Sequence, residues 1–305
     1  MDQQVAQAIA AIAADNVTGA AEIAERSADV LLRQVRSIEE SHEALQSALL
    51  DAGWALIDAH PTMAPLVNLV NQVLWRCDTT PNLREMRQAV SETVAGFKRR
   101  LRVHEAAIAE KTMPLISEGM RIITIGRSTT VRAALRYAQR AGRRFEVICA
   151  EGRPGYEGRA LATELADAGI PVKLVIDALA ISSVPSTQLV LVGADHLTSE
   201  AMANKIGTYG LALAAKASDV PFYALCGSEK FMPLGYTPPL QSPWPGAQVW
   251  DHAPDGVTIE NRSFDLTPIS TLSGIVTEQG VLSAVGIESW LAAIHLHPTL
   301  KQAKR

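Results

Sequence analysis

The sequence has few cysteines, few aromatic residues and no excess of positive charge. Its three cysteines, Cys77, Cys149 and Cys226, are an odd number and lie far apart in the chain. This pattern fits neither a disulfide framework nor the C-x-x-C spacing of a zinc site. The net charge is −4 at pH 7, so no long-range positive field attracts nucleic acid. We therefore expect a cytoplasmic protein with no direct nucleic-acid partner.

Long apolar runs and the common cofactor motifs are also missing. No uncharged run is long enough to cross a bilayer, and the N-terminus has no basic segment ahead of an apolar stretch. We therefore expect neither secretion nor membrane insertion. The glycine patterns of nucleoside triphosphate and dinucleotide sites do not occur, and the seven histidines show no H-E-x-x-H spacing. The sequence predicts no metal and no cofactor.

What the sequence does contain is a large apolar fraction, 48% of 305 residues, first in helical and then in strand-like patterns. Up to about residue 118 the apolar spacing is three and four, as from Leu66 to Leu74. Breaks between these helices are predicted at Asp15-Asn16, at His60-Pro61 and before Pro81. We predict a helical N-terminal domain over residues 1–118.

From residue 119 to residue 305, short β-rich runs alternate with amphipathic segments. The predicted strands cover residues 122–125, 145–149, 172–176, 189–192 and 222–225. Strands that are apolar on both faces and separated by helices are typical of a mostly parallel sheet covered on both sides. The fold class is therefore α/β, with a helical bundle followed by a Rossmann-like domain. Further helices are expected at residues 269–276 and 287–296.

Ligands of such sheets bind beyond the carboxyl ends of the strands, so the residues after each strand are candidates. The turn from Gly126 to Thr130 offers the guanidinium of Arg127, the hydroxyl of Ser128 and the free amides of the next helix. A helix N-terminus with these groups is suited to an anion. The alternative is an ordinary helix cap formed by Ser128.

Asp195 follows the apolar run 189–192. A carboxylate at the end of a buried strand is partly desolvated, which raises its pKa toward the range useful for proton transfer. The alternative is a structural acceptor that caps a neighbouring loop.

Asn204 and Lys205 begin a polar segment that opens a predicted helix, where Lys205 is placed to meet a phosphate. Lys230, after the last predicted strand, is a second candidate of the same kind. The alternative for both lysines is an ordinary solvated side chain.

Together these segments resemble the translation initiation factor 2B alpha/beta/delta family. The superfamily also contains methylthioribose-1-phosphate isomerase and ribose-1,5-bisphosphate isomerase. The matching segments are Glu151 to Pro154 with Gly158, Ala168 to Val172, Val192 to Asp195, Asn204 to Thr208, Ser228 to Phe231, Asp265 to Pro268 and Thr277 to Leu282. The most specific of them is Asn204 to Thr208.

The resemblance implies a homodimer or higher homo-oligomer and a site that binds a phosphorylated small molecule. It assigns a catalytic role to Asp195. It assigns substrate contacts to a set of nine residues: Gly19, Ala20, Arg127, Ser128, Arg153, Glu157, Asn204, Lys205 and Lys230.

Several positions depart from the pattern of the isomerases. The isomerase cysteine falls at Gly126 or its neighbours, none of which is a cysteine. Two arginines that grip substrate are replaced by Thr18 and His60, and a glutamine is replaced by Glu157. Because an aldose-ketose proton shuttle needs an acid and a base together, loss of one partner costs on the order of a hundredfold in rate.

Three functions follow from this comparison of retained and lost residues. The first, which we favour, is a binding protein for a phosphorylated sugar or nucleotide that is regulatory or retains a degraded isomerase activity. The second is a working aldose-1-phosphate to ketose isomerase that uses Asp195 with a new partner, such as His196, Glu157 or Ser128. The third is an assembly subunit without a ligand.

Overall fold

A computed structural model describes residues 3–15, 18–37, 41–238 and 244–301. The chain divides into two compact units, each made of segments that are distant in sequence. The first contains residues 1–103, 229–239 and 289–305, and the second contains residues 104–228 and 240–288. The domain boundary that the sequence suggests after residue 118 stays a prediction.

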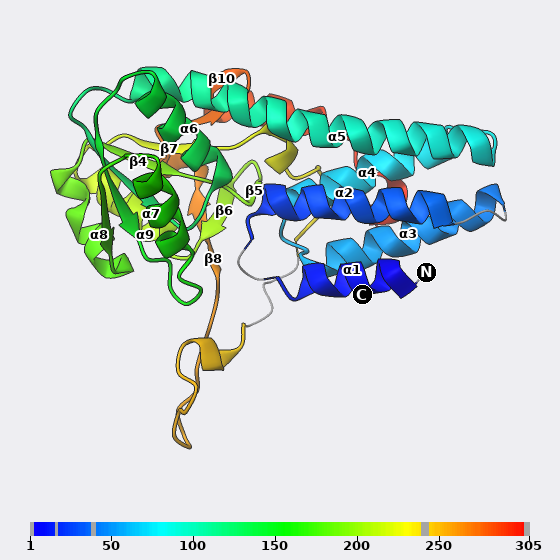
Figure 1. Cartoon of the computed structure of the whole chain (residues 1–305), viewed down its shortest axis with the longest axis horizontal. Helices are drawn as coiled ribbons and strands as arrows, with labels where there is room; N and C mark the ends of the chain where they lie inside the picture. The colour runs from blue at the N-terminus through cyan, green and yellow to red at the C-terminus, as the bar shows by residue number, and fades with distance from the viewer. Residues whose placement is uncertain (1–2, 16–17, 38–40, 239–243, 302–305) are drawn as a thin grey trace. The chain divides into compact units, whose positions relative to one another are not determined.

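The first unit is helical, as the apolar spacing predicts (Figure 1). Its helices are α1 (Gln3–Ala13), α2 (Ala20–Ser37), α3 (His42–Ala59), α4 (Ala64–Asp78) and the first part of α5 (Leu83–Thr112). The gaps after α1, α3 and α4 fall at the predicted breaks, although Asn16 lies outside the described residues, and no break was predicted between α2 and α3. Helix α4 is buried along almost its whole length, because it packs against both α2 and α3.

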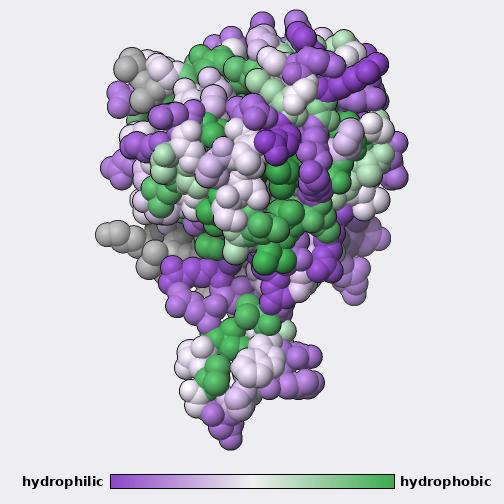
Figure 2. Space-filling model, turned by 90° about the vertical axis from the view of Figure 1, so that its left-hand side faces the viewer, coloured by the Kyte–Doolittle hydropathy of each residue, from purple (hydrophilic) through white to green (hydrophobic). Residues whose placement is uncertain are grey.

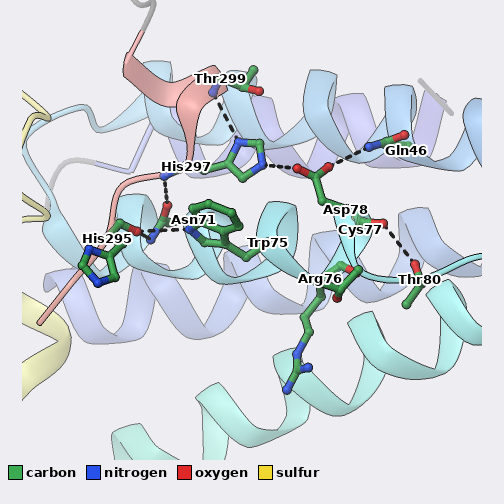
Figure 3. Close-up of polar contacts among 11 residues, drawn as sticks. Gln46, Asn71, Trp75, Arg76, Cys77, Asp78, Thr80, His295, His297 and Thr299 are labelled. Atoms are coloured by element: carbon green, nitrogen blue, oxygen red, sulfur yellow. Dashed lines mark hydrogen bonds and ion pairs between the residues drawn. The ribbon is translucent and has the colours of Figure 1, made fainter.

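Residues 295–299 bind to α4 through a polar network in the first unit (Figure 3). The buried ring of His297 bonds through Nε2 to Asp78 Oδ2 (2.8 Å), and its Nδ1 accepts from the amide of Thr299 (3.3 Å). Because Nδ1 accepts, the ring hydrogen is on Nε2, and this N–H donates the hydrogen bond to Asp78. Asn71 accepts from the amide of His297 (2.7 Å) and donates to the carbonyl of His295 (3.0 Å). These bonds fix the segment before α11 (Pro298–Lys301).

We expect His297→Ala to loosen this terminal segment. The substitution removes the imidazole bond to Asp78, so the free energy of unfolding should fall by about 1–2 kcal/mol. Hydrogen exchange of the amides of residues 295–301 should rise in the same variant. Gln46→Ala removes an exposed bond to the same carboxylate (3.0 Å) and serves as the control, with a smaller effect. Unchanged exchange in His297→Ala would contradict the expectation.

The second unit is built on a seven-stranded sheet in the order β10-β9-β7-β4-β1-β2-β3. Its strands are β1 (Arg121–Ile125), β2 (Glu146–Ala150), β3 (Val172–Val175), β4 (Leu189–Val192), β7 (Phe222–Leu225), β9 (Gly274–Thr277) and β10 (Gly280–Leu282). All neighbours pair in parallel except β9 and β10. The five predicted strands and the α/β fold class are confirmed.

Two helix predictions need correction. Residues 269–276 form a short 3-10 turn, Ile269–Thr271, followed by β9, because this segment pairs with β7 in the core of the sheet. The helix expected at residues 287–296 is α10 (Ala284–Ala292), which begins earlier and ends before Ile294.

Helices cover both faces of the large sheet. Alternate strand residues, among them Ile122, Val147 and Leu191, share one buried cluster with α6 (Thr129–Arg140) and α7 (Glu157–Asp167). Ile125 points to the face opposite Ile122, since side chains alternate along a strand, and lies against Gly207. Helix α9 (Thr208–Ala217) starts there, and α8 (Asp177–Ser183) packs beside it. These layers leave the carboxyl edge of the strands to the connecting loops.

A small second sheet, which the sequence did not predict, is formed by segments that follow β4 in the chain. It has the order β5-β6-β8, with β5 (His196–Leu197), β6 (Ala201–Lys205) and β8 (Phe264–Pro268). Asn204 and Lys205 therefore end a strand and do not open a helix, because β8 pairs with β6 along its whole length, Asn204 and Lys205 included. Their side chains are held by the sheet, and α9 begins only at Thr208.

No described helix is long and apolar enough to cross a membrane.

Candidate functional site

The candidate site lies where the strand order of the large sheet reverses. From β1 the chain runs to β2 and β3 on one side, whereas β4 and β7 lie on the other. The loops after β1 and β4 diverge at such a point, which is where open α/β sheets bind their ligands. Gly126 follows β1 with a φ of +72°, and Gly193 follows β4. Both glycines lie against residues of the predicted site.

The loops after β1 and β4 and the end of β6 meet at these glycines. A Cβ on Gly193 would lie 2.6 Å from Ser128 Oγ and 3.8 Å from Asn204 Oδ1. A Cβ on Gly126 would lie 3.2 Å from the Cβ of Lys205. Three segments distant in sequence therefore converge at one edge of the sheet. This grouping brings together Ser128, Asn204 and Lys205, as the sequence predicted.

Lys205 forms a buried ion pair with Glu157, the first residue of α7. Its Nζ lies 2.9 Å from Glu157 Oε1, and the two side chains are only 8% and 9% exposed. Glu157 Oε2 is buried and has no hydrogen-bond partner. Lys205 is thus not an ordinary solvated lysine. Burial of a charged pair is costly unless further hydrogen bonds satisfy both groups. The unpaired oxygen Oε2 is therefore the unusual feature of this site.

Glycines of the loop between β2 and α7 enclose the Glu157 carboxylate. A Cβ on Gly155 would lie 2.6 Å from Oε1, and a Cβ on Gly152 would lie 3.0 Å from Oε2. Asp177 fixes this loop by accepting hydrogen bonds from the amides of Gly152 and Arg153 (both 2.8 Å). Side chains at either glycine would collide with the carboxylate, so the loop sequence is fitted to it.

Ser128 caps α6, so the capping alternative of the sequence analysis is confirmed for this residue. Its Oγ accepts from the amide of Val131 (3.3 Å). The intrahelical ladder begins with Arg132, whose amide donates to Ser128 O (3.0 Å). The amides of Thr129 and Thr130 precede that ladder, at the positive end of the helix dipole.

Arg127 pairs with a carboxylate on the neighbouring helix. Its guanidinium lies 2.9 Å from Glu164 Oε1, and Arg132 lies 2.8 Å from the other oxygen of Glu164. Glu164 is desolvated by partial burial, but its bonds to Arg132 and Arg127 outweigh this and lower its pKa. Much of the positive charge at this turn is therefore balanced within the protein.

Arg153 extends toward the loop that precedes β8. Its guanidinium lies over the ring of Tyr156, 5.0 Å from the centroid, and bonds to the Tyr156 hydroxyl. It also donates to the carbonyl of Val249 (3.2 Å). Tyr156 has a φ of +60°. The guanidinium of Arg159 also lies over its ring, 3.8 Å from the centroid. These contacts hold the loop before α7 on the second unit.

Asp195 lies in the link between β4 and β5 and is partly buried. Its amide donates to the carbonyl of Ala203 (2.9 Å), which continues the pairing of β5 with β6. Asp195 is therefore opposite the end of β6, the strand that carries Asn204 and Lys205. Its catalytic role stays a prediction.

The three cysteines are buried. Cys149 belongs to the core cluster beneath α6 and α7, where burial raises the pKa of its thiol to about 12. Burial also raises the pKa of Cys77 to about 12, with the Asp78 charge adding to the effect. Cys226 follows β7 and is fully buried. A thiol nucleophile needs a low pKa and access, and Cys149 has neither.

The remaining predicted contacts belong to the first unit. Ala20 is the buried first residue of α2, and Gly19 accepts from the amide of Ile23 (3.0 Å). Lys230 is buried in a short turn, Ser228–Lys230. Asn68 of α4 holds this turn by donating to the carbonyls of Glu229 and Phe231 (both 2.8 Å). Contact of these three residues with a ligand stays a prediction.

Asp265 of β8 is a site residue that the sequence reasoning did not single out. Its Oδ2 accepts from the amides of Gly207 (2.8 Å) and Tyr209 (3.1 Å), so it caps α9 from a distant strand. Gly207, with a φ of +101°, makes the turn that follows Lys205. Asp265 lies in one of the segments that resemble the family, and no role was predicted for it.

We expect Asp265→Ala to cost about 1–2 kcal/mol in the free energy of unfolding, because two amides lose their acceptor. Asp265→Asn should cost less, since its amide oxygen accepts from both. Chemical denaturation of the two variants measures the difference. Equal losses would contradict a capping role.

Burial raises the pKa of Asp265 above its ordinary value of 3.8, although the amides of Tyr209 and Gly207 act in the opposite direction. The folded protein therefore binds this proton more tightly than the unfolded chain. Stability from this group is greatest at low pH and is lost as the pH rises through the folded pKa. The stability of the wild type relative to Asp265→Asn should accordingly decrease as the pH rises above 3.8.

No group of three histidine, cysteine, aspartate or glutamate side chains within the described ranges gathers as a set of metal ligands.

Comparison with known proteins gives matches over most of the chain. The model of the Initiation factor 2 subunit family matches residues 16–284. A putative translation initiation factor eIF-2B subunit 2-like protein of Pyrococcus horikoshii is 30% identical over 283 residues, which cover 92% of this chain and 97% of that protein. A ribose 1,5-bisphosphate isomerase of Archaeoglobus fulgidus is 30% identical over 289 residues, which cover 92% of this chain and 90% of that protein.

A solved structure gives the same result. The crystal structure of the Pyrococcus horikoshii translation initiation factor eIF-2B matches with a TM-score of 0.81 and 28% identity, covering 92% of this chain and 98% of that one. The relatives carry the names of an initiation factor and of an isomerase, so they leave the specific function open. Because the family model and both relatives span most of the sequence, the chain belongs to the Initiation factor 2 subunit family.

Proposed function

We propose that this protein binds a phosphorylated sugar or nucleotide at the carboxyl edge of β1, β2 and β4, and that it acts by binding rather than by rapid turnover. The observation that carries the proposal is the buried pair of Lys205 and Glu157, whose second carboxylate oxygen has no partner. A charged pair with an unpaired hydrogen-bond acceptor, located where the strand order reverses, is suited to a polar ligand. The amides of Thr129 and Thr130 offer a place for its phosphoryl group.

The cysteines support binding over rapid isomerisation. The position after β1 is Gly126, and its Cβ position faces Lys205, so this loop carries no thiol. Cys149, the nearest cysteine in sequence, packs in the core with its pKa raised. Loss of one partner in a proton shuttle costs on the order of a hundredfold or more in rate.

The test is a thermal-shift screen with sugar phosphates and nucleoside monophosphates. A ligand that binds only the native state raises the melting temperature, by an amount that grows with its concentration over Kd. We expect stabilisation by at least one phosphorylated pentose or nucleotide and none by its dephosphorylated form at equal concentration. No shift with any phosphorylated compound at millimolar concentration would overturn the proposal.

A working isomerase is the second candidate, and the open oxygen of Glu157 favours it specifically. A buried carboxylate next to a lysine is a candidate base for moving a proton between adjacent carbons, with Asp195 as the acid. Turnover of ribose-1,5-bisphosphate or methylthioribose-1-phosphate, lost in both Glu157→Gln and Asp195→Asn, would support it. Absence of turnover with both substrates leaves the binding function.

We further propose that the protein forms a homodimer or higher homo-oligomer. Exposed apolar side chains on β3 and after it, Leu174, Ile176 and Leu179, support this, with Ile176 60% exposed. Figure 2 shows hydrophobic surface gathered on the face of the second unit near α8 and α9. Light scattering coupled to size exclusion measures the mass. A monomer at micromolar concentration would contradict the proposal.

A further inference from the structure

A cavity of about 300 Å³ lies at the amino edge of the large sheet, opposite the edge that carries the candidate site. It is lined by Pro221 and Ser273, which precede β7 and β9, and by the last turn of α9. All of its lining residues belong to the second unit. The volume is at the lower limit for small-molecule sites in proteins. The cavity is therefore a candidate site that is independent of the proposed function.

Helix α9 ends at this cavity with a residue that is unfavourable there. The amide of Val220 donates to the carbonyl of Ala215 (2.9 Å), and the intervening Asp219 has a φ of +54°. Glycine is the usual residue at this position, because a side chain is strained in the left-handed region. A carboxylate is also disfavoured, since the carbonyl groups at the end of a helix form the negative end of its dipole. Asp219 therefore weakens the end of α9 in two ways.

Two other helices on the same sheet end with the usual residue. Both α6 and α7 close with the same hydrogen bond, in which the amide after the left-handed residue donates to a carbonyl five residues earlier (both 3.1 Å). The left-handed residue is Gly142 after α6, with a φ of +87°, and Gly169 after α7, with a φ of +78°. The chain thus uses glycine where the turn alone matters. Residues that break a local rule in this way occur most often at functional sites.

The cavity offers charged and polar groups of both kinds. It is lined by Lys216 and Asp219, and within the described ranges neither side chain forms an ion pair or a hydrogen bond. Ser273 Oγ accepts from the first amide of β7 (3.0 Å), so its hydroxyl hydrogen is left to donate. The hydroxyl of Thr271 donates to the last carbonyl of β8 (2.7 Å), so its oxygen is left to accept. Two donors suit a carboxylate, and two acceptors suit an ammonium group.

We propose that this cavity binds a free aliphatic α-amino acid, with its ammonium group at Asp219 and its carboxylate at Lys216 and Ser273. The bound ammonium offsets the charge of Asp219 and the negative end of the α9 dipole, which accounts for an aspartate at a position suited to glycine. Val220 and Leu272 are partly buried in the lining and suit an aliphatic side chain. Because Lys216 and Asp219 are exposed to solvent, the dissociation constant is on the order of millimolar.

The experiment is an NMR titration of the full-length protein with L-leucine, followed at the amides of residues 215–220 and 270–273. We expect saturable shifts of these amides at millimolar leucine. Isocaproate lacks the ammonium group and isoamylamine lacks the carboxylate. Each should bind at least about tenfold more weakly, which is the usual loss for a charge-assisted hydrogen bond. Absence of shifts with leucine, or equal affinity for either analogue, would overturn the proposal.

Asp219→Gly is the informative variant, because it separates stability from binding. Glycine removes the strain and the unfavourable charge at the end of α9, so the melting temperature without ligand should rise by about 2–4 °C. Leucine binding should fall at least about tenfold in the same variant. Unchanged leucine binding in Asp219→Gly, or a lower melting temperature, would overturn the proposal.

Lys216→Met tests the other end of the ligand. It should weaken binding of leucine and of isocaproate at least about tenfold and leave isoamylamine unaffected, because only the carboxylate loses its partner. Lys173→Met is the matched control, since Lys173 is an exposed lysine of β3 that does not line the cavity. The control should bind leucine as the wild type does. Equal effects of Lys216→Met on leucine and on isoamylamine would contradict the proposed orientation and overturn the assignment.

Discussion

Lys205→Met is expected to destabilise the second unit by about 3–5 kcal/mol, which is the usual loss when one partner of a buried ion pair is removed. The reason is that Glu157 would remain charged and buried with no partner on either oxygen. Urea denaturation followed by circular dichroism measures the loss. The double variant Lys205→Met with Glu157→Gln should recover most of it, because no unpaired charge remains.

Burial, and not pairing itself, is the cause of this expected effect. Lys173 and Glu146 form a pair of the same length, 2.9 Å, but Lys173 is 61% exposed. Lys173→Met should therefore cost less than about 1 kcal/mol. Similar losses in Lys173→Met and Lys205→Met would show that the Lys205 pair is not protected from solvent.

Gly158→Ala is the second substitution with a large expected effect. Gly158 is the second residue of α7, and a Cβ there would lie 1.8 Å from the carbonyl oxygen of Ala150 at the end of β2. The obstacle is backbone and cannot rotate away, so α7 must move from the sheet. We expect a loss of about 3 kcal/mol or more, at the upper end for overpacking, together with displacement of Glu157.

Gly96→Ala is the matched control for this prediction. It also lies within a helix, α5, but its Cβ would contact only the ends of arginine side chains, at 3.5 Å or more. Alanine in an open helical position is favourable by roughly 0.5–1 kcal/mol over glycine. Thermal denaturation of both variants should therefore shift in opposite directions. A small effect of Gly158→Ala would mean that α7 adjusts without strain.

Much of the architecture is predictable from local pattern alone. The apolar spacing of three and four located helices α1, α4 and α5, and the breaks at Pro61 and Pro81 located the ends of α3 and α4, because proline restricts the residue before it. The β-rich runs located five of the parallel strands, four of them buried along most of their length and so nearly continuously apolar, with β3 as an exposed edge strand. Periodicity missed the small sheet: β5 has two residues, and β6 reads as polar beyond Ala203.

The candidate site was predictable only in part. The rule for strand ends placed Ser128, Asp195 and the loop before Glu157 at one edge, and the structure agrees for Ser128 and Glu157. Asp265 was missed because its capping contact joins residues more than fifty positions apart. The pairing of Arg127 with Glu164 was missed for the same reason, since a sequence does not show which charges are neighbours in space.

The sequence by itself determined the fold class, the family and the absence of a cysteine after the first strand, because each depends on residue type and local order. Tertiary structure decided what the charged residues do. It buried Lys205 against Glu157, left one carboxylate oxygen open and placed Cys149 in the core. The physical reason is that desolvation and electrostatic pairing depend on distance and burial, which arise only when strands and helices distant in sequence pack together.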